Sequence, residues 1–345
     1  MHRKQILSRP TRPLTIDSKK SVAALLEKMC GISFQGRQLG IAYQIWKEML
    51  GDRVMIMMGL AGAMVPAGMR RLIVYMIKNR LIDCLVSTGA NLFHDYYESK
   101  GNYHYQSTPE MDDVALQKNL IDRIYDTLAD EAKFREHDLE IGSFAASLDP
   151  SRAYTTREFL YLLGKELSKR AKEDGILTAA AKAKVPIYCP AIGDSSIGIG
   201  IAENRHLGKN QFNFDVIGDV LETAHLAADS PASGVIYFGG GTPKNFTNQT
   251  EVTASFIRDS HHGHKYAMQI ITDSAHWGGL SGCTFEEAQS WGKIAYDAKM
   301  VTCHCDSTIA MPMLVSALSE HPGLIRKRKK PQFEMGHELK FKFPK

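Results

Sequence analysis

The sequence predicts an α/β fold with a doubly wound, mainly parallel sheet and helices on both faces. Short apolar runs alternate with segments of helical periodicity along most of the 345 residues, as expected for parallel strands joined by crossover helices. Loops rich in glycine, serine, threonine and aspartate follow the apolar runs, where such sheets bind ligands. A chain of this length can bury the large core that the fold requires.

Seven apolar runs have the length of buried strands, and they lie at 53–58, 81–86, 185–188, 213–217, 234–238, 266–271 and 300–304. Helical patterns separate most of them, at 67–79, 114–129, 156–172, 216–228, 246–258, 285–298 and 308–319. Thr155 and Glu158 have the spacing of a capping box, which supports a helix start between them.

Two helices precede the first strand. The first is expected to begin after a cap at Asp17–Ser18 and to end near Cys30, and the second to span 37–50. Residues 1–17 are expected to form a flexible arm, 18–320 a single domain, and 321–345 a basic C-terminal tail. Residues 100–113 are polar and are expected to form an insertion or an active-site loop.

The composition indicates a cytoplasmic globular protein that does not contact membranes. Charged residues make up 23% of the chain, no apolar run has the length of a membrane span, and the basic N-terminus lacks the apolar stretch of a signal peptide. The net charge of +4 arises from residues 326–345, which carry eight Lys/Arg and two Glu. We expect the basic run 326–330 to be a solvated, disordered extension, and no nucleic-acid binding.

The sequence predicts no metal site. The six cysteines are scattered and mostly lie in apolar runs, as expected for reduced thiols in a core. Residues 303–305 (CHC) offer only two ligands on one face of a strand and have no second pair at zinc-site spacing. His261, His262 and His264 form a cluster in a polar loop, for which metal binding is a minor alternative.

Five polar loops are expected at one edge of the sheet, because the carboxyl ends of parallel strands meet there. They lie at 86–91, 191–198, 238–245, 271–274 and 305–308. Glycines let a backbone approach a phosphate, and the helix that follows presents free N–H groups to it. Each loop alone is also an ordinary turn, but five together favour a large polar ligand. No GxGxxG fingerprint of an ordinary Rossmann dehydrogenase occurs.

The segment 286–294 is the most informative in the chain, because Lys293 follows Trp291 and Gly292 there. A nucleophilic lysine must be neutral, and burial beside apolar or aromatic surface favours that form. A tryptophan can also hold a cationic substrate against its ring. Taken alone, the segment is better interpreted as a helix end with a solvated lysine.

From about residue 31 to 320 the chain resembles deoxyhypusine synthases and their bacterial-type relatives. The resemblance is carried by GISFQG at 31–36, TGAN at 88–91, CPAIGD at 189–194, GGG at 239–241, the segment 281–293 and DS at 306–307. It implies a doubly wound NAD-binding domain that assembles as a homotetramer with active sites at subunit interfaces.

The resemblance also implies a reaction. In this family NAD oxidises spermidine at its secondary amine, and cleavage of the imine releases 1,3-diaminopropane. The aminobutyl group is held on the enzyme lysine as a Schiff base and then moves to an acceptor amine. The retained NADH reduces the new imine, so the net reaction is a transfer.

By this resemblance Lys293 is the nucleophile, and Glu287, Trp291 and Asn245 bind substrate. Thr284 and Glu287 also have capping-box spacing, so Glu287 has an equally good structural interpretation. Trp291 and Lys293 would not share a face of a regular helix, so Gly292 would have to interrupt it or two subunits would use the two faces. The implied cofactor-binding residues are Thr88, Gly89, Ala90, Asp194, Gly240, Thr272, Asp273, Asp306 and Ser307.

The chain departs from the family at positions where, by the resemblance, carboxylates bind the ammonium ends of spermidine. Eukaryotic members carry aspartates where this chain has Ile199 and Leu280, and a histidine where it has Asn245. Loss of two carboxylates removes ion pairs to ammonium groups and makes the pocket more apolar. The same family contains homospermidine synthases, which use putrescine as the acceptor.

The sequence therefore favours an NAD-dependent aminobutyltransferase that uses spermidine as donor and a small diamine such as putrescine as acceptor. The alternative is a deoxyhypusine synthase that modifies a lysine of a translation factor. Two further alternatives are a non-catalytic protein that binds NAD or polyamine, and a conventional NAD oxidoreductase.

Overall fold

A computed structural model describes residues 7–16, 18, 21–258 and 263–344. The predicted cap residue Asp17 and the histidines at 261 and 262 lie outside these residues. Within the described part, residues 7–16 carry no helix or strand, and the first helix begins after Ser21, whose hydroxyl accepts a hydrogen bond from Ala24 N.

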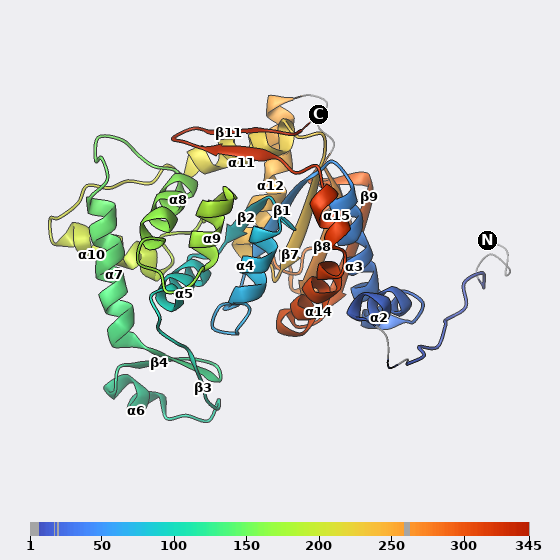
Figure 1. Cartoon of the computed structure of the whole chain (residues 1–345), viewed down its shortest axis with the longest axis horizontal. Coiled ribbons are helices and arrows are strands. Elements are labelled where there is room, and N and C mark those ends of the chain that lie inside the picture. Colours follow the sequence, from blue (N-terminus) through green and yellow to red (C-terminus); the bar gives the residue numbers. More distant parts are fainter. Residues whose placement is uncertain (1–6, 17, 19–20, 259–262, 345) are drawn as a thin grey trace.

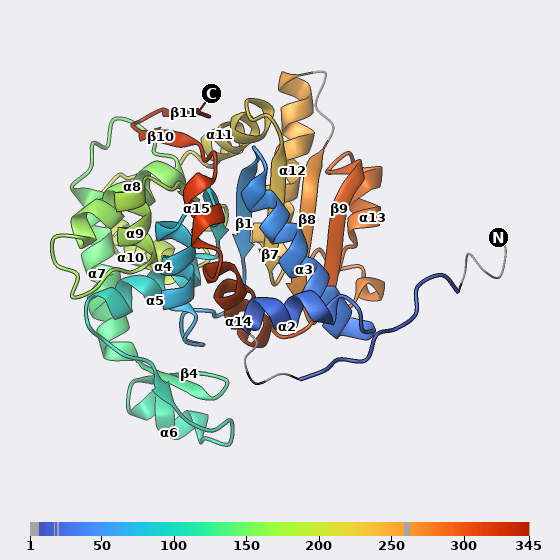
Figure 2. The same cartoon turned by 45° about the vertical axis from the view of Figure 1, so that its right-hand side comes forward.

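The core of the molecule is a six-stranded sheet in which every neighbouring pair is parallel (Figures 1 and 2). In spatial order its strands are β6 (Ile187–Tyr188), β2 (Cys84–Ser87), β1 (Met55–Leu60), β7 (Ser233–Phe238), β8 (His264–Ile271) and β9 (Ile294–His304). The chain runs outward from β1 to β2 and β6, and then from β7 to β9 on the other side. The strand order therefore reverses between β1 and β7, which is where folds of this class bind ligands.

Helices bury both faces of the sheet. One face packs against α2 (Val22–Met29), α3 (Phe34–Gly51), α4 (Arg70–Lys78) and α14 (Ser307–Ser319). The other face packs against α11 (Val216–Ala228), α12 (Gly241–Ile257) and α13 (Phe285–Ser290). Ile56 and Met58 of β1 belong to the first core, and Met55 and Met57 to the second. This alternation on two buried faces explains why the strands are apolar throughout.

A third group of helices packs beside the edge strand β6. It consists of α5 (Gly89–Ser99), α7 (Glu131–Ala146), α8 (Thr156–Leu167), α9 (Ile176–Ala183) and α10 (Ser196–His206). The predicted capping box is confirmed at its first residue, because the Thr155 hydroxyl accepts a hydrogen bond from Glu158 N. The doubly wound α/β class and the helices on both faces are thus confirmed.

The helix predicted at 114–129 is wrong. Residues 103–130 form a protruding unit (Figure 2). It contains α6 (Asp113–Lys118) and an antiparallel sheet of β3 (Tyr105–Gln106), β5 (Thr127–Asp130) and β4 (Ile121–Ile124), and α6 lies between β3 and β4 in the chain. Leu120 has a φ of 55° and Tyr125 a φ of 56°. Both left-handed residues stop helical propagation, and the second forms the turn between β4 and β5.

Two other sequence predictions are corrected near the sheet. Residues 213–217 are not a strand of the sheet, because Phe214 forms only an isolated bridge with Tyr154 and α11 already begins at Val216. The helix predicted at 285–298 ends at Ser290, and β9 begins at Ile294. Gly292, at a φ of 70°, makes the break between them.

The basic C-terminal segment is folded rather than solvated. It forms α15 (Pro322–Lys327) and a hairpin of β10 (Gln332–Met335) and β11 (Leu339–Lys342) that lies beside α11 (Figure 1). Arg328 is buried against Asp83 and donates to the carbonyls of Arg80 and Val54. The basic run 326–330 predicted a solvated extension, but Arg328, one of its five cations, is buried and attaches the segment to Asp83.

No helix among the described residues is long and apolar enough to span a membrane. All six cysteines are free thiols.

Candidate functional site

The five predicted loops lie at one edge of the sheet. They follow β2, β6, β7, β8 and β9, which all run in the same direction in the parallel sheet, so that their carboxyl ends lie at the same edge. Four helices begin directly after these strands, namely α5, α10, α12 and α14. Their first turns lie at this edge, where backbone N–H groups would stabilise an anionic ligand, although Gly241 N and Thr308 N already donate to side chains of the protein. We call this the strand-end edge.

Gly240 lies at the point where the strand order reverses. A Cβ atom on Gly240 would lie 2.5 Å from Ser281 Cα, so only glycine allows this contact. Gly241 N donates to Ser281 Oγ at 3.0 Å, and Gly239 approaches Ala61. The loop after β1, residues 61–69, therefore lies beside Gly239 and Gly240 at the point where the strand order reverses. This loop was not predicted from the sequence, although Gly62 and Gly68, which follow an apolar run, were a signal for it.

Thr88, Gly89, Ala90 and Asp194 lie on the loops after β2 and β6. Thr88 precedes α5, and its Oγ1 accepts a hydrogen bond from Asn91 Nδ2. A Cβ on Gly89 would lie 2.3 Å from Ser195 Oγ, so the two loops are in direct contact there. Ala90 and Asp194 are exposed at the surface of this edge.

Thr272, Asp273, Asp306 and Ser307 lie on the loops after β8 and β9. Cys305 N donates to Ile271 O, which holds these two strand ends side by side. Asp306 caps α14, because its Oδ1 accepts hydrogen bonds from both the backbone N and the hydroxyl of Thr308. The carboxylate thus has a structural function at the helix start whatever ligand it also contacts.

Lys293 lies between α13 and β9, and not on a helix. Its backbone N donates to Ala288 O, and its carbonyl accepts from His264 N at the start of β8. The side chain is 9% exposed, and Nζ lies 3.4 Å from Asn245 Oδ1 on α12. The lysine is therefore held in a buried position by two neighbouring elements.

The turn at Gly292 brings Trp291 and Lys293 to the same side. Lys293 Nζ lies 5.1 Å from the centroid of the Trp291 ring, at cation–π distance. A regular helix would have separated the two side chains. The turn at Gly292 therefore lets Trp291 and Lys293 of one chain meet, without the need for two subunits.

All four predicted catalytic and substrate-binding residues line one cavity of about 260 Å³. Lys293, Asn245, Glu287 and Trp291 are joined there by Lys244, Asn248, Gln249, Ala275, Gly278, Gly279, Leu280 and Cys283. Glu287 is the one carboxylate among these lining residues. The Thr284 hydroxyl accepts from Glu287 N, so the capping interpretation holds for the backbone of Glu287 while its carboxylate faces the cavity.

Lys244 is a cavity residue that sequence reasoning missed. It is 1% exposed, and its Nζ donates to Gln269 Oε1, Ser281 O and Cys283 O. Its pKa is lowered to about 8, chiefly by burial; the charges of Cys283 and Glu287 oppose this shift, and repulsion from Lys293 adds to it. Its position next to Asn245, one turn into α12 after the glycines, was the available signal.

The two positions at which the family's aspartates are replaced lie in different places. Leu280 lines the cavity and is 54% exposed, whereas Ile199 lies on α10 and is 57% exposed. Asp273, His276 and Trp277, which are near Leu280 in the sequence, are not among the residues that line the cavity, and Trp277 is 78% exposed. Within this chain the cavity therefore has an apolar, open rim.

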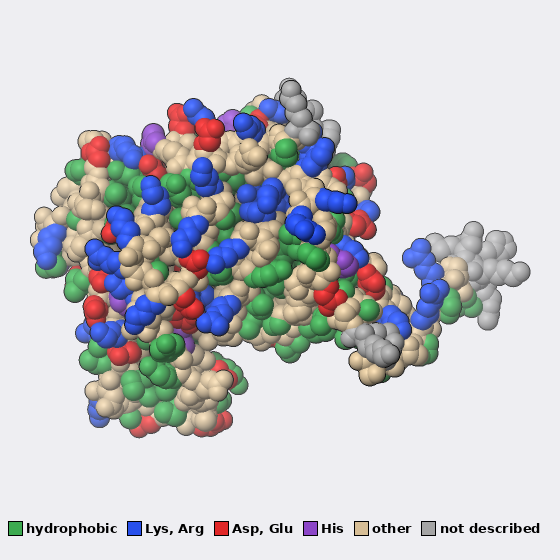
Figure 3. All heavy atoms as spheres, viewed as in Figure 1, with side chains coloured by type: hydrophobic (Ala, Val, Ile, Leu, Met, Phe, Trp, Pro, Cys, Tyr) green, Lys and Arg blue, Asp and Glu red, His purple; other side chains and the backbone are tan. Residues whose placement is uncertain are grey.

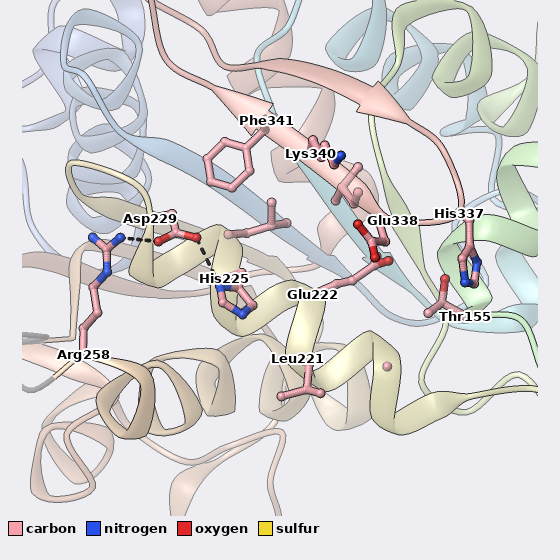
Figure 4. Close-up of a pocket in the computed structure, with 13 residues that line it drawn as sticks. Thr155, Leu221, Glu222, His225, Asp229, Arg258, His337, Glu338, Lys340 and Phe341 are labelled. Carbon is pink, nitrogen blue, oxygen red and sulfur yellow. Dashed lines mark hydrogen bonds and ion pairs between the residues drawn. The ribbon is translucent and has the colours of Figure 1, made fainter.

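A second cavity of about 710 Å³ lies between α11 and the C-terminal hairpin and contains none of the predicted site residues (Figure 4). Several of its charged groups already form ion pairs within the protein. Asp229 pairs with Arg258 and His225, and Glu222 pairs with Arg157. The smaller cavity is the better candidate because it holds a buried lysine beside an aromatic ring and a carboxylate.

Residues 24–318 match the family model described as deoxyhypusine synthase. The chain belongs to the deoxyhypusine synthase family. It is 48% identical to a probable deoxyhypusine synthase 2 of Methanosarcina mazei, covering 93% of this chain and 92% of the relative. It is 47% identical to a probable deoxyhypusine synthase 2 of Archaeoglobus fulgidus, covering 88% of this chain and 99% of the relative.

More distant members give the same assignment. A deoxyhypusine synthase-like protein of Chlorobaculum tepidum is 33% identical over 91% of this chain and 90% of its own length. The crystal structure of a putative deoxyhypusine synthase from Entamoeba histolytica matches with a TM-score of 0.57 at 18% identity, covering 89% of this chain and 95% of that one. The latter likeness concerns the fold. As a member of this family, the protein is a transferase of aminobutyl groups.

Proposed function

We propose that the protein transfers the aminobutyl group of spermidine, through an imine on Lys293, to a small diamine such as putrescine. The observation that carries the proposal is the buried Lys293, with Asn245 and the Trp291 ring beside its Nζ in a cavity that also holds Glu287. A nucleophilic lysine needs burial and a substrate ammonium needs a carboxylate, and this cavity offers both.

The strand-end edge fits NAD. Four helix N-termini and the close approach at Gly240 provide the backbone N–H groups that a diphosphate requires. We assign cofactor binding to Thr88, Gly89, Ala90, Asp194, Gly240, Thr272, Asp273, Asp306 and Ser307. NAD, when bound, would accept a hydride from the secondary amine of spermidine and would later return it to the imine formed with the acceptor amine.

The chain's own residues would perform the transfer. Neutral Lys293 Nζ attacks the carbon of the substrate imine, 1,3-diaminopropane leaves as the amine, and the aminobutyl group remains on Lys293 as an imine. The Trp291 ring and Glu287 hold the substrate's remaining ammonium groups. The acceptor amine then attacks the same carbon and frees Lys293.

A small acceptor is favoured by the cavity itself. Leu280 lies in its lining where eukaryotic deoxyhypusine synthases carry an aspartate, so the cavity departs from the branch of the family that modifies a protein lysine. The second candidate is deoxyhypusine synthesis on a translation-factor lysine. The names of the relatives from Methanosarcina mazei and Archaeoglobus fulgidus favour it. We further propose a cytoplasmic homotetramer with sites at subunit interfaces.

The test is to incubate the protein with NAD, labelled spermidine and excess putrescine, and to identify the products by mass spectrometry. We expect homospermidine and 1,3-diaminopropane, and after borohydride reduction a label on Lys293. Lys293→Ala should abolish all three, whereas Lys299→Ala, an exposed lysine on β9, should abolish none. Diaminopropane without homospermidine would overturn the small acceptor and favour the protein lysine.

A further inference from the structure

Asn248 presents hydrogen-bond donors to the Lys293 cavity that the fold itself does not use. The side chain lies on α12, lines the cavity and is only 2% exposed. Its Oδ1 accepts a hydrogen bond from Tyr237 OH at 2.6 Å, whereas its Nδ2 donates to no described residue. Nδ2 is nonetheless accessible, because no fully buried amide nitrogen among the described side chains lacks a hydrogen-bond partner. Since Asn248 is otherwise enclosed, its N–H groups face into the cavity.

Tyr237 keeps the amide in this orientation. Its ring is fully buried on β7 and lies 6.3 Å from the Phe285 ring, and a Cβ atom on Gly59 would lie 2.8 Å from it. Burial, and then the charge of Glu251, raise the pKa of Tyr237 well above its usual value, so the phenol keeps its proton. If the amide turned over, the buried hydroxyl would lose its acceptor, which is costly. The carbonyl of Asn248 is therefore held by the tyrosine, and the N–H groups are held toward the cavity.

The cavity thus offers two kinds of polar group to a ligand. Glu287 offers a carboxylate, which pairs with an ammonium group. An amide N–H cannot pair with an ammonium group, which has only donors, but it can donate to a hydroxyl, a carbonyl or the lone pair of a neutral amine. Gln249 also lines the cavity, but it is exposed and forms no hydrogen bond with a described residue, so either end of its amide can face a ligand. The donors of Asn248, in contrast, are fixed.

We propose that Asn248, held by the Tyr237 hydroxyl, is a specificity-determining residue that selects ligands with one ammonium end and one uncharged polar end. The ammonium end contacts Glu287, and the uncharged end accepts a hydrogen bond from Asn248 Nδ2. The inference rests on the proposed binding of amines in this cavity. A diamine acceptor then binds with its second amine neutral, which is the form that a nucleophile requires.

Three small amines of similar length test this selection by binding alone, measured by calorimetric titration of the full chain in the presence of NAD. At neutral pH 4-aminobutanol has an ammonium and a hydroxyl end, butylamine has only the ammonium, and putrescine has two ammonium groups. We expect the unchanged protein to bind 4-aminobutanol about two- to tenfold more tightly than butylamine, as for one hydrogen bond, and more tightly than putrescine. Equal affinity for 4-aminobutanol and butylamine would overturn the proposal without any substitution.

Two substitutions should shift the preference toward putrescine. Asn248→Asp keeps an acceptor for Tyr237 and replaces the N–H donors by a carboxylate oxygen, so putrescine should gain about tenfold relative to 4-aminobutanol. Tyr237→Phe removes the hydroxyl that holds the amide, whose carbonyl can then turn to the cavity, and we expect a shift of about two- to threefold in the same direction. Gln332→Glu, the same change of amide to carboxylate at an exposed position on β10, is the control and should leave the order unchanged.

A purely structural Asn248 would make both variants weaken all three amines alike, and that result would overturn the proposal. An unchanged order of affinities in folded Asn248→Asp would also overturn it. If Asn248→Asp does not fold, an unchanged order in Tyr237→Phe has the same consequence.

Imine trapping with labelled spermidine separates this inference from the proposed function. The expected order of affinities with no trapped imine in the unchanged protein would refute spermidine transfer and retain the selection by Asn248. A trapped imine on Lys293 with equal affinities for 4-aminobutanol and butylamine would retain the transfer and refute the selection. If none of the three amines binds, the selection is refuted, and imine trapping alone decides the transfer.

Discussion

Gly240 is the residue at which the strand-end edge and the Lys293 cavity come into contact. Its backbone lies against Ser281, whose carbonyl accepts a hydrogen bond from Lys244 in the cavity. The hydroxyl of the same serine accepts from Gly241 N at the start of α12. A side chain at position 240 would therefore disturb both the predicted cofactor loop and the wall of the cavity.

We predict that Gly240→Ala weakens NAD binding at least tenfold and lowers the free energy of unfolding by about 1–3 kcal/mol, the cost of overpacking. The new methyl group would meet Ser281 at 2.5 Å, and backbone has to move. Calorimetric titration with NAD and thermal unfolding measure the two effects. Gly279→Ala is the matched control, because its Cβ would meet open space. Unchanged NAD affinity in Gly240→Ala would remove Gly240 from the cofactor site.

Trp291 offers a second test at the residue scale. Its ring is 65% exposed and lies 5.1 Å from Lys293 Nζ, so it can hold a substrate cation with little effect on folding. A cation–π contact at an exposed site contributes about 0.5–1 kcal/mol. Trp291→Leu should therefore raise the KM for spermidine about two- to fivefold while kcat and the melting temperature stay nearly constant, and Trp291→Phe should have a smaller effect. A fall in kcat with an unchanged KM would contradict this role.

At the scale of elements, the sequence revealed strands better than helices. Runs such as 53–58 and 234–238 are apolar throughout because both faces of the sheet are buried, and that signal is local. The failures depended on single backbone conformations or distant partners. Leu120 and Tyr125 divide a helical pattern by adopting positive φ, and Arg328 folds a basic run inward by binding Asp83.

The candidate site could be predicted in its residues but not in its geometry. Motif resemblance supplied Lys293, Trp291, Glu287 and Asn245, and the structure brings all four to one cavity. The resemblance could not predict the turn at Gly292, which brings Lys293 and Trp291 into contact. It could not predict Lys244 either, because the importance of Lys244 depends on its burial and on hydrogen-bond acceptors from β8 and the 281–283 loop.

The C-terminal segment is predicted to stabilise the domain through Arg328. Its guanidinium and Asp83 are both fully buried, and removal of Arg328 leaves the buried carboxylate of Asp83 with Arg80 as its remaining ion-pair partner among the described residues. Arg328→Met should lower the free energy of unfolding by about 3–5 kcal/mol, measured by denaturant titration. Lys329→Ala, one residue further and exposed, should change it by less than about 0.5 kcal/mol. Equal stability of the two variants would mean that the segment is not anchored as described.

At the scale of the whole molecule, large apolar side chains lie exposed in two regions. Around the Lys293 cavity these are Trp277, Leu280 and Trp291, which are 54–78% exposed. The protruding unit carries others, including Tyr103 and Tyr125, and hydrophobic side chains gather on its surface (Figure 3). Monomeric proteins rarely expose extended apolar patches, so these regions favour burial by further copies of the chain.

We therefore predict that the protein is a homotetramer and that its activity depends on assembly. Light scattering after size exclusion should give about four times the chain mass of 38.4 kDa. If the open rim of the cavity is completed by a neighbouring copy, specific activity in imine trapping should fall on dilution in parallel with the tetramer fraction. Bovine albumin at the same total concentration controls for surface loss. Full activity per chain in a dilute monomer would show that one chain contains the complete site, and the apolar rim would then need a different explanation.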